Sequence, residues 1–183
     1  IGSYIYWGND QDDTIGRSSL DGTGVNPSFI TDTGGACTVV SDGTYLYWTT
    51  RFGGEGGSIG RANLDGTGVN QSFTSLNGRP NFVGLAMSGG ALYYGNNWGF
   101  IGRVDSLTAG GTDCYAYIPL SGTPSGIAIS GNYMYWGNSN ATTIGRATLD
   151  GITVNESFIR IAGNPGGLAT DGTTVFISDE ENS

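Results

Sequence analysis

The tripeptide Ile-Gly-Arg recurs four times in this chain of 183 residues at an almost constant spacing. Its copies cover residues 15–17, 59–61, 101–103 and 144–146, which lie 44, 42 and 43 residues apart. A fixed period of this length is typical of a unit of four short β-strands or of a helical repeat. No segment carries apolar residues at helical spacing, and the 34 glycines disfavour helices. The repeat therefore predicts an all-β fold.

Each repeat contains four segments with the character of short strands. The first is small and apolar, at residues 37–40, 83–86, 125–128 and 166–169. The second is aromatic, at residues 4–7, 45–48, 91–94 and 133–136, with a weaker fifth copy at 174–177. The third is the Ile-Gly-Arg segment, and the fourth covers residues 25–30, 69–74, 114–118 and 154–159. Asp-Gly pairs, which accept the positive φ of tight hairpins, separate most of these segments.

Four-stranded antiparallel units that repeat in this way predict the blades of a β-propeller. The repeats cover about residues 1–36, 37–82, 83–124 and 125–165, with a partial copy at 166–183. They predict a leading piece of three strands, three complete blades and a trailing piece of two strands. We therefore expect residues 1–183 to form one propeller, or a segment of one, with four to five blades. A segment of a larger ring is the simpler interpretation. In a small closed ring residues 166–169 would complete the leading blade, and the strand at residues 175–177 would belong to no blade.

The aromatic strand followed by Ile-Gly-Arg-x-x-Leu-Asp-Gly-Thr resembles the YWTD repeat of low-density-lipoprotein-receptor-type propellers, especially bacterial ones. The resemblance spans essentially the whole chain, and it implies a six-bladed parent ring that binds ligands or acts as a spacer and is not an enzyme. The sequence departs from the motif after the aromatic segment. Gly8-Asn9, Thr49-Thr50, Gly95-Asn96 and Gly137-Asn138 stand where Thr-Asp is expected, and Ser178-Asp179 alone keeps the acid. Any structural role of that aspartate must be lost or taken over by asparagine.

Charge and composition restrict the partners of the chain. It contains no lysine and no histidine, and its formal net charge is −9. Such a surface repels phosphate backbones and anionic lipids, and no apolar stretch is long enough to span a membrane. We therefore expect neither nucleic acid nor membrane insertion. The chain begins at Ile1 without a signal peptide, as a processed chain or a fragment would, and its Thr, Ser, Asn and Gly content is typical of an exported bacterial surface protein. We expect a secreted or cell-surface location.

The repeated arginines and tryptophans are interpreted as structural. Arg17, Arg61, Arg103 and Arg146 occur once in each repeat, so we expect them to tie each blade to its neighbour by hydrogen bonds. The alternative is a basic ring for an anionic ligand. Trp7, Trp48 and Trp136 lie in register within strands, so we expect them in the core between blades, with sugar stacking as the alternative.

Candidate binding residues lie outside the repeat pattern. In an up-and-down blade, the loops from second to third strand share one rim with the connections between blades. These segments differ in every repeat, whereas the turns at the other rim are mostly short, so recognition is expected at the variable rim. Trp98, Arg51, Phe52 and Arg79 are the side chains there that are best able to anchor a ligand or a partner.

A metal site and an enzyme are the weaker alternatives. The loop with Asp10, Asp12 and Asp13 has alternating oxygen ligands like those of calcium sites, but it lacks the glycine and distant glutamate of an EF-hand. A solvated acidic loop is favoured, and no cofactor is expected. Without histidine there is no Ser-His-Asp or Cys-His nucleophile. Two carboxylates can hydrolyse glycosides, but most of the acids here occur in Asp-Gly turns, so a propeller hydrolase or lyase stays a remote alternative.

Two hypotheses for function follow. The first is a binding or adhesion module that presents its loops to a protein or a glycan. The second is a structural subunit of an extracellular assembly that self-associates through the edges of unfinished blades. The two cysteines, Cys37 in a first strand and Cys114 in a fourth strand of the next blade, are expected not to bond to each other.

Overall fold

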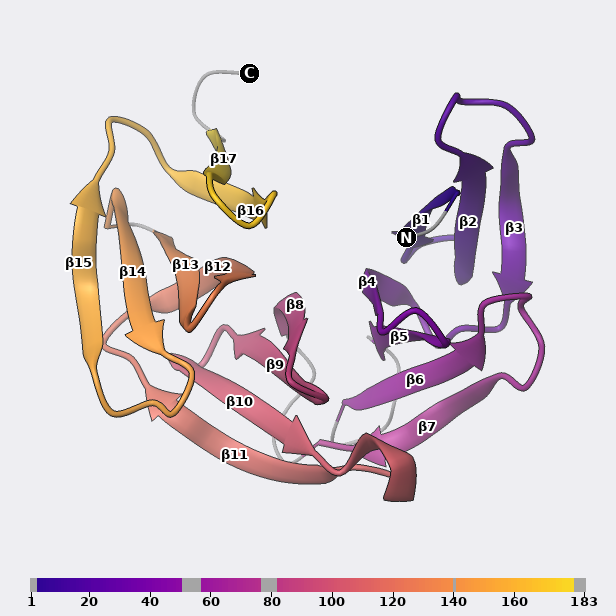
Figure 1. Cartoon of the computed structure of the whole chain (residues 1–183), viewed down its shortest axis with the longest axis horizontal. Coiled ribbons are helices and arrows are strands. Elements are labelled where there is room, and N and C mark those ends of the chain that lie inside the picture. Colours follow the sequence, from indigo (N-terminus) through magenta and orange to yellow (C-terminus); the bar gives the residue numbers. More distant parts are fainter. Residues whose placement is uncertain (1–2, 51–56, 77–81, 140, 180–183) are drawn as a thin grey trace. The chain divides into compact units, whose positions relative to one another are not determined.

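The computed structural model describes residues 3–50, 57–76, 82–139 and 141–179, which form two compact units (Figure 1). One unit comprises Ile1–Phe82 with Ser106–Asp113, and the other comprises Val83–Asp105 with Cys114–Ser183. The described residues contain β-strands and one 3-10 helix, η1 (Leu107–Ala109). No helix in these ranges is long and apolar enough to cross a membrane.

The first unit contains two antiparallel sheets. The sheet of three strands has the order β1-β2-β3, and the sheet of four has the order β4-β5-β6-β7. Their bounds are β1 (Tyr4–Asn9), β2 (Thr14–Ser19), β3 (Asn26–Thr31), β4 (Ala36–Ser41), β5 (Tyr45–Thr50), β6 (Ser58–Asn63) and β7 (Asn70–Ser75). The two sheets pack against each other where β1 lies beside β4.

The second unit contains most of one four-stranded sheet, a second complete one and a pair of strands. The orders are β8-β9-β10-β11, β12-β13-β14-β15 and β16-β17. The bounds are β8 (Phe82–Ser88), β9 (Ala91–Asn96), β10 (Phe100–Asp105), β11 (Thr112–Pro119), β12 (Thr123–Ser130), β13 (Tyr133–Ser139), β14 (Thr143–Thr148), β15 (Val154–Arg160), β16 (Pro165–Thr170) and β17 (Val175–Asp179). Every strand expected from the repeat is present, in sheets of three, four, four, four and two strands.

Each Ile-Gly-Arg glycine pairs directly with the last aromatic residue of the preceding strand. The pairs are Gly16 with Trp7, Gly60 with Trp48, Gly102 with Tyr94 and Gly145 with Trp136. In each pair the ring lies against the glycine so closely that a Cβ atom at the glycine would overlap it. Glycine within a strand commonly marks such a close approach. The glycine of the motif thus lets the aromatic ring lie directly against the strand backbone.

The side chains around Trp48 and Trp136 form the cores between neighbouring sheets. Trp48 packs with Ile15, Ile30 and Leu46 in the first unit, and all four side chains are buried. Trp136 lies in the corresponding cluster of the second unit and is also buried. The buried indole N–H groups are satisfied, because Trp48 Nε1 donates to the Thr33 carbonyl over 2.8 Å and Trp136 Nε1 donates to Asn138 Oδ1 over 2.8 Å.

Asparagine has a specific role at the position where the resembled family has aspartate. The third and fourth strands lose register at their Ile-Gly-Arg glycine, and a carbonyl of the fourth strand lies opposite the irregularity. Asn9 Nδ2 donates to the Pro27 carbonyl over 3.0 Å, and Asn138 Nδ2 donates to the Glu156 carbonyl over 2.6 Å. An ionised aspartate has no hydrogen to donate to a carbonyl. Asparagine therefore adds a second donor to a carbonyl that the hydroxyl of Thr14 or Thr143 also contacts, which an ionised aspartate could not do.

Candidate binding rim

The loops from second to third strand and the connections between sheets lie on the same rim, because one hydrogen bond joins them in each of four sheets. The backbone N–H of Thr33, Leu76, Leu120 and Ile161 donates to the carbonyl of Asp13, Gly57, Gly99 and Thr142, respectively, over 3.3, 2.9, 2.8 and 2.9 Å. The acceptor residue immediately precedes the Ile-Gly-Arg strand every time. Three of these acceptors, Asp13, Gly99 and Thr142, have the positive φ that turns the carbonyl toward the connection. Each of these hydrogen bonds thus ties the last residue of a loop to the neighbouring connection.

Trp98 is an exposed aromatic side chain on this fixed backbone. Its residue is 61% exposed, although it lies in the short loop between β9 and β10. The backbone N–H of Trp98 donates to Asn96 Oδ1 over 2.8 Å, and Asn96 itself is buried. The next residue, Gly99, accepts from Leu120 in the adjacent connection. The loop is therefore held on both sides, and it presents the indole to solvent.

The other three predicted binding residues, Arg51, Phe52 and Arg79, lie outside the described residues. The structure does place further groups on the rim near Trp98. Thr123 Oγ1 donates to the Asn97 carbonyl over 3.4 Å, and both the N–H and the hydroxyl of Ser121 donate to Glu156 Oε2 over 2.8 Å. No sequence signal singled out Glu156, because its carboxylate reaches the connection only after β15 has folded beside it.

The carboxylate of Asp13 has a structural role in the acidic loop. Asp13 Oδ1 accepts from the Gly35 N–H over 2.7 Å and from Thr33 Oγ1 over 3.1 Å, so it ties the loop to the connection between the first two sheets. Among residues 3–50, 57–76, 82–139 and 141–179, no three acidic, cysteine or histidine side chains are grouped so as to hold a metal ion. Asp10, Asp12 and Asp13 therefore do not form such a group.

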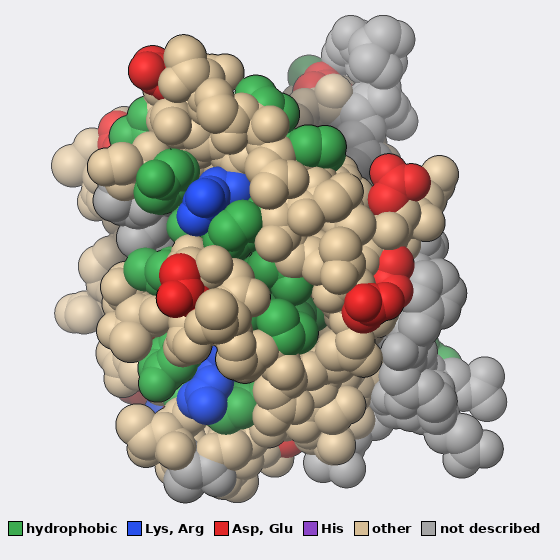
Figure 2. Space-filling model, turned by 90° about the vertical axis from the view of Figure 1, so that its right-hand side faces the viewer, with side chains coloured by type: hydrophobic (Ala, Val, Ile, Leu, Met, Phe, Trp, Pro, Cys, Tyr) green, Lys and Arg blue, Asp and Glu red, His purple; other side chains and the backbone are tan. Residues whose placement is uncertain are grey.

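The four repeated arginines lie between aromatic rings of their own sheet. The guanidinium of Arg17 lies 4.4 Å from the Tyr4 ring centroid and 3.9 Å from that of Phe29. Arg61 and Arg146 contact the corresponding rings of their second and fourth strands, whereas Arg103 contacts Tyr93, two residues further along its second strand, and Tyr117 of the fourth. Cation–π stacking of this kind is worth about 0.5–2 kcal/mol per contact. On the face drawn in Figure 2 the basic side chains occur at separate places beside hydrophobic ones, and do not gather into one basic patch.

Tyrosine hydroxyls donate hydrogen bonds between neighbouring sheets, whereas we expected such bonds from the repeated arginines. Tyr6 Oη donates to the Leu64 carbonyl over 3.4 Å, and Tyr117 Oη donates to the Leu149 carbonyl over 2.9 Å. Both acceptors begin a Leu-Asp-Gly turn of the next sheet. Arg61 is the exception, since it donates to the Leu107 carbonyl of η1 over 3.3 Å.

Trp7 differs from the other two repeat tryptophans. Trp48 and Trp136 are fully buried in cores between sheets, whereas Trp7 is only half-buried. The reason is that β1 pairs with β2 alone in the described chain, whereas β5, β9 and β13 each lie between two strands. The sequence position of Trp7 in the repeat did not reveal this difference.

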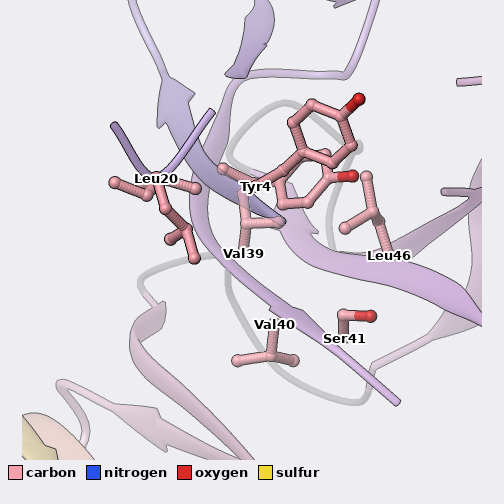
Figure 3. A pocket seen from close by; sticks show the side chains of 8 residues that line it. Tyr4, Leu20, Val39, Val40, Ser41 and Leu46 are labelled. Atoms are coloured by element: carbon pink, nitrogen blue, oxygen red, sulfur yellow. The ribbon is translucent and has the colours of Figure 1, made fainter. Parts of the chain in front are cut away.

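A pocket that no sequence motif indicated lies beside β1 in the first unit (Figure 3). It has a volume of about 270 Å³. Its lining side chains come from β1, β4, β5 and the turn after β2, and they are Tyr4, Ile5, Tyr6, Leu20, Val39, Val40, Ser41 and Leu46. Ser41 and the two tyrosine hydroxyls are the only side-chain polar groups in this apolar lining.

The two cysteines are thiols on the surface. Cys37 lies in β4, the first strand of its sheet, and Cys114 lies in β11, the fourth strand of its sheet, as expected. They are not joined to each other by a disulfide bond.

Comparisons with known proteins agree with this fold. No protein-family model and no curated protein sequence matches the chain. Among solved structures, a chain of a nidogen/laminin complex is similar at 18% identity, with a TM-score of 0.76 over 98% of this chain and 68% of its own. A gluconolactonase from Xanthomonas campestris is similar at 15% identity, with a TM-score of 0.75 over 96% of this chain and 65% of its own. The fold is a β-propeller.

A virginiamycin B lyase from Staphylococcus aureus is also similar, at 22% identity, with a TM-score of 0.70 over 97% of this chain and 59% of its own. Our chain thus spans 59 to 68% of the length of these three propellers. At these identities the similarity shows the fold and no activity, and the three proteins have different roles.

Proposed function

We propose that this propeller is a non-enzymatic binding module, secreted or displayed at a cell surface, whose variable rim contacts a protein partner. The observation that carries the proposal is Trp98, a 61% exposed indole on a loop with a fixed backbone. Tryptophan is among the residues that contribute most to protein interfaces, and a preorganised loop lowers the entropy cost of binding. The nidogen propeller in complex with laminin is a similar fold that binds a protein.

The chemistry of the chain favours binding over catalysis. The similar virginiamycin B lyase was crystallised as a catalytically inactive variant in which a histidine is replaced by alanine. Our chain contains no histidine, so it cannot supply that side chain. Most of the aspartates outside the rim accept hydrogen bonds within their own turns. A glycan is the alternative ligand, since an exposed indole also stacks on sugar rings.

The test is a selection of binders from a naive peptide library displayed on phage, carried out against the 183-residue chain. We expect Trp98→Ala to weaken most selected peptides at least ten-fold and to leave the thermal midpoint unchanged, because the side chain is exposed. Ile152→Ala is the matched control, since Ile152 is 82% exposed in a turn of the opposite rim.

Peptides that are weakened by Ile152→Ala and not by Trp98→Ala would show that the wrong rim was chosen. If no peptide is enriched while an immobilised glycan panel retains the wild-type chain and releases the Trp98→Ala variant, the ligand is a glycan.

A further inference from the structure

The sheet β8-β9-β10-β11 departs from the repeat on its third and fourth strands together. In the other three sheets the residue before Ile-Gly-Arg is a threonine or a serine, whose hydroxyl donates to a carbonyl of the fourth strand. Phe100 stands at this position in β10 and has no hydroxyl. The sequence Asn-x-Ser-Phe of the other fourth strands is replaced in β11 by Cys-Tyr-Ala-Tyr at residues 114–117. Departures from an otherwise consistent pattern are expected at functional sites.

The changed residues build an aromatic cluster at the end of the sheet that carries the β9–β10 loop. Phe100 is buried, and its ring centroid lies 4.5 Å from that of Tyr115 and 6.3 Å from that of Tyr94. Tyr115 is 47% exposed, so part of its ring is open to solvent. Trp98 is exposed and precedes Phe100 by two residues. Two exposed aromatic side chains thus flank a ring that is anchored in the sheet.

A carboxylate from the neighbouring sheet reaches the same region. The N–H of Leu120 donates to the Gly99 carbonyl at the end of the Trp98 loop, and the next residue, Ser121, donates to Glu156 Oε2. Glu156 of β15 therefore contacts the connection that holds this loop. The chain has a formal net charge of −9 and contains no lysine. A negative group beside exposed rings on an acidic protein favours a cationic partner group.

Arg103 shows what such a set of groups can hold, because it lies in the same sheet. Its guanidinium lies 5.7 Å from the Tyr93 ring centroid and 5.2 Å from that of Tyr117. Its Nε donates to Asp105 Oδ1 over 2.9 Å. Two aromatic rings and one carboxylate thus bind one guanidinium within the chain itself.

We propose that Trp98, Tyr115 and Glu156 form a binding site for an arginine side chain of the partner. The guanidinium stacks on the exposed rings, and the carboxylate supplies the opposite charge. Arginine suits this combination because its planar group stacks on aromatic faces and is more weakly hydrated than an ammonium group. The inference rests on the rim function proposed above, and it names the chemistry that the protein partner must present.

The probe is the tripeptide acetyl-Gly-Arg-Gly-amide, titrated into the ¹⁵N-labelled 183-residue chain. We expect saturable shifts of the NMR signals of the Trp98 indole N–H and the Tyr115 amide, with the buried indoles of Trp48 and Trp136 unchanged. The Trp98→Ala variant identifies the Trp98 signal. The same peptide with citrulline in place of arginine has the same shape without the charge, and it should bind at least about three-fold more weakly.

Two variants test the ring and the carboxylate separately. Tyr115→Leu keeps an apolar side chain against Phe100 but removes the aromatic face, and it should weaken the arginine peptide at least about three-fold. Glu156→Gln keeps an acceptor for Ser121 but removes the charge, and a similar loss is expected. Asp171→Asn is the matched control, because it removes the same charge in a turn of the opposite rim and should leave the affinity unchanged. Thermal midpoints show that all three variants fold.

Equal affinity for the arginine and citrulline peptides would overturn the proposal. Absence of saturable shifts would also overturn it, as would an affinity that neither Tyr115→Leu nor Glu156→Gln lowers. If selected phage peptides depend on Trp98 but the arginine tripeptide does not bind, the rim function stands and the arginine site fails. If the tripeptide binds as expected but no selected peptide depends on Trp98, the arginine site stands and the protein-binding rim fails.

Discussion

At the scale of single residues, the glycine of each Ile-Gly-Arg segment is fixed by what lies opposite it. The aromatic ring of the preceding strand covers the glycine, and the same ring fills the core between sheets at Trp48 and Trp136. The neighbouring arginine stacks between two further rings. The isoleucine of each copy is fully buried, so the three consecutive residues have three distinct packing roles, which explains why the tripeptide recurs as a unit.

Replacement of this glycine should therefore be costly where the ring is buried. In Gly145→Ala the new methyl group overlaps the Trp136 ring, which has no free space to move into because it is 0% exposed. We expect a loss of about 1–3 kcal/mol in the free energy of unfolding, the usual cost of overpacking. Gly122→Ala is the control, since a methyl group there meets nothing within 4 Å. Urea unfolding of both variants measures the difference, and equal midpoints would contradict the ring-on-glycine contact.

At the scale of elements, aspartates hold the hairpin turns through hydrogen bonds to their own loop. Asp65 Oδ1 accepts from the hydroxyl of Thr67 over 2.6 Å and from its N–H over 2.9 Å, and Asp21, Asp150 and Asp171 make similar bonds. These bonds lower the pKa of each of the four carboxyl groups below the ordinary value of 3.8. The cause is that the donated hydrogens stabilise the charged form.

The direction of the shift sets the pH dependence of stability. A carboxyl group with a lowered pKa in the folded state stabilises the fold fully above its unfolded value of about 3.8, and it loses that contribution as the pH falls through the lowered value. We expect the thermal midpoint to fall on acidification below about pH 4. A variant with all four aspartates replaced by asparagine keeps the acceptor oxygen and cannot titrate. Its midpoint should be similar at neutral pH and should fall less in acid, and an equal fall in both proteins would contradict the role of the turns.

At the scale of the whole molecule, small first strands let neighbouring sheets of a unit approach. In the second unit β12 lies beside β16, and Gly126 faces the backbone of Gly166 and Leu168. In the first unit the close approach involves Gly8 at the end of the aromatic strand β1, which lies against the backbone of Ala36 and Cys37 in the first strand β4. Backbone atoms cannot rotate away as a flexible side chain can, so the spacing between sheets depends on these glycines.

Gly126→Ala should disturb this packing directly. Its Cβ atom would lie 2.7 Å from the Leu168 nitrogen, so one strand must shift, and we expect a loss of about 1–3 kcal/mol in unfolding free energy. Gly167→Ala, on the adjoining strand, is the matched control, because its nearest neighbour is the Ser178 hydroxyl at 3.7 Å. Chemical unfolding compares the two variants, and a smaller loss for Gly126→Ala than for Gly167→Ala would argue against close packing of β12 on β16.

The sequence by itself determined the strands, their antiparallel order and the blade repeat. Local signals are sufficient for this, because the 43-residue period, the Asp-Gly turns and the alternation of small and aromatic segments each specify neighbours along the chain. The same signals placed Trp98 in a loop outside the repeat.

Only the tertiary structure decided which contacts the repeated side chains make. The stacking of Arg17, the half-buried state of Trp7 and the pocket beside Ile5 depend on strands that are distant in the sequence or missing at an edge. The role of Asn138, which stands where the resembled family has aspartate, likewise depends on a distant residue, because its side chain donates to the Glu156 carbonyl eighteen residues away. The repeat pattern predicted a leading piece of three strands, but it did not predict how deeply each side chain there is buried, because burial depends on strands packed beside it that are distant in the sequence.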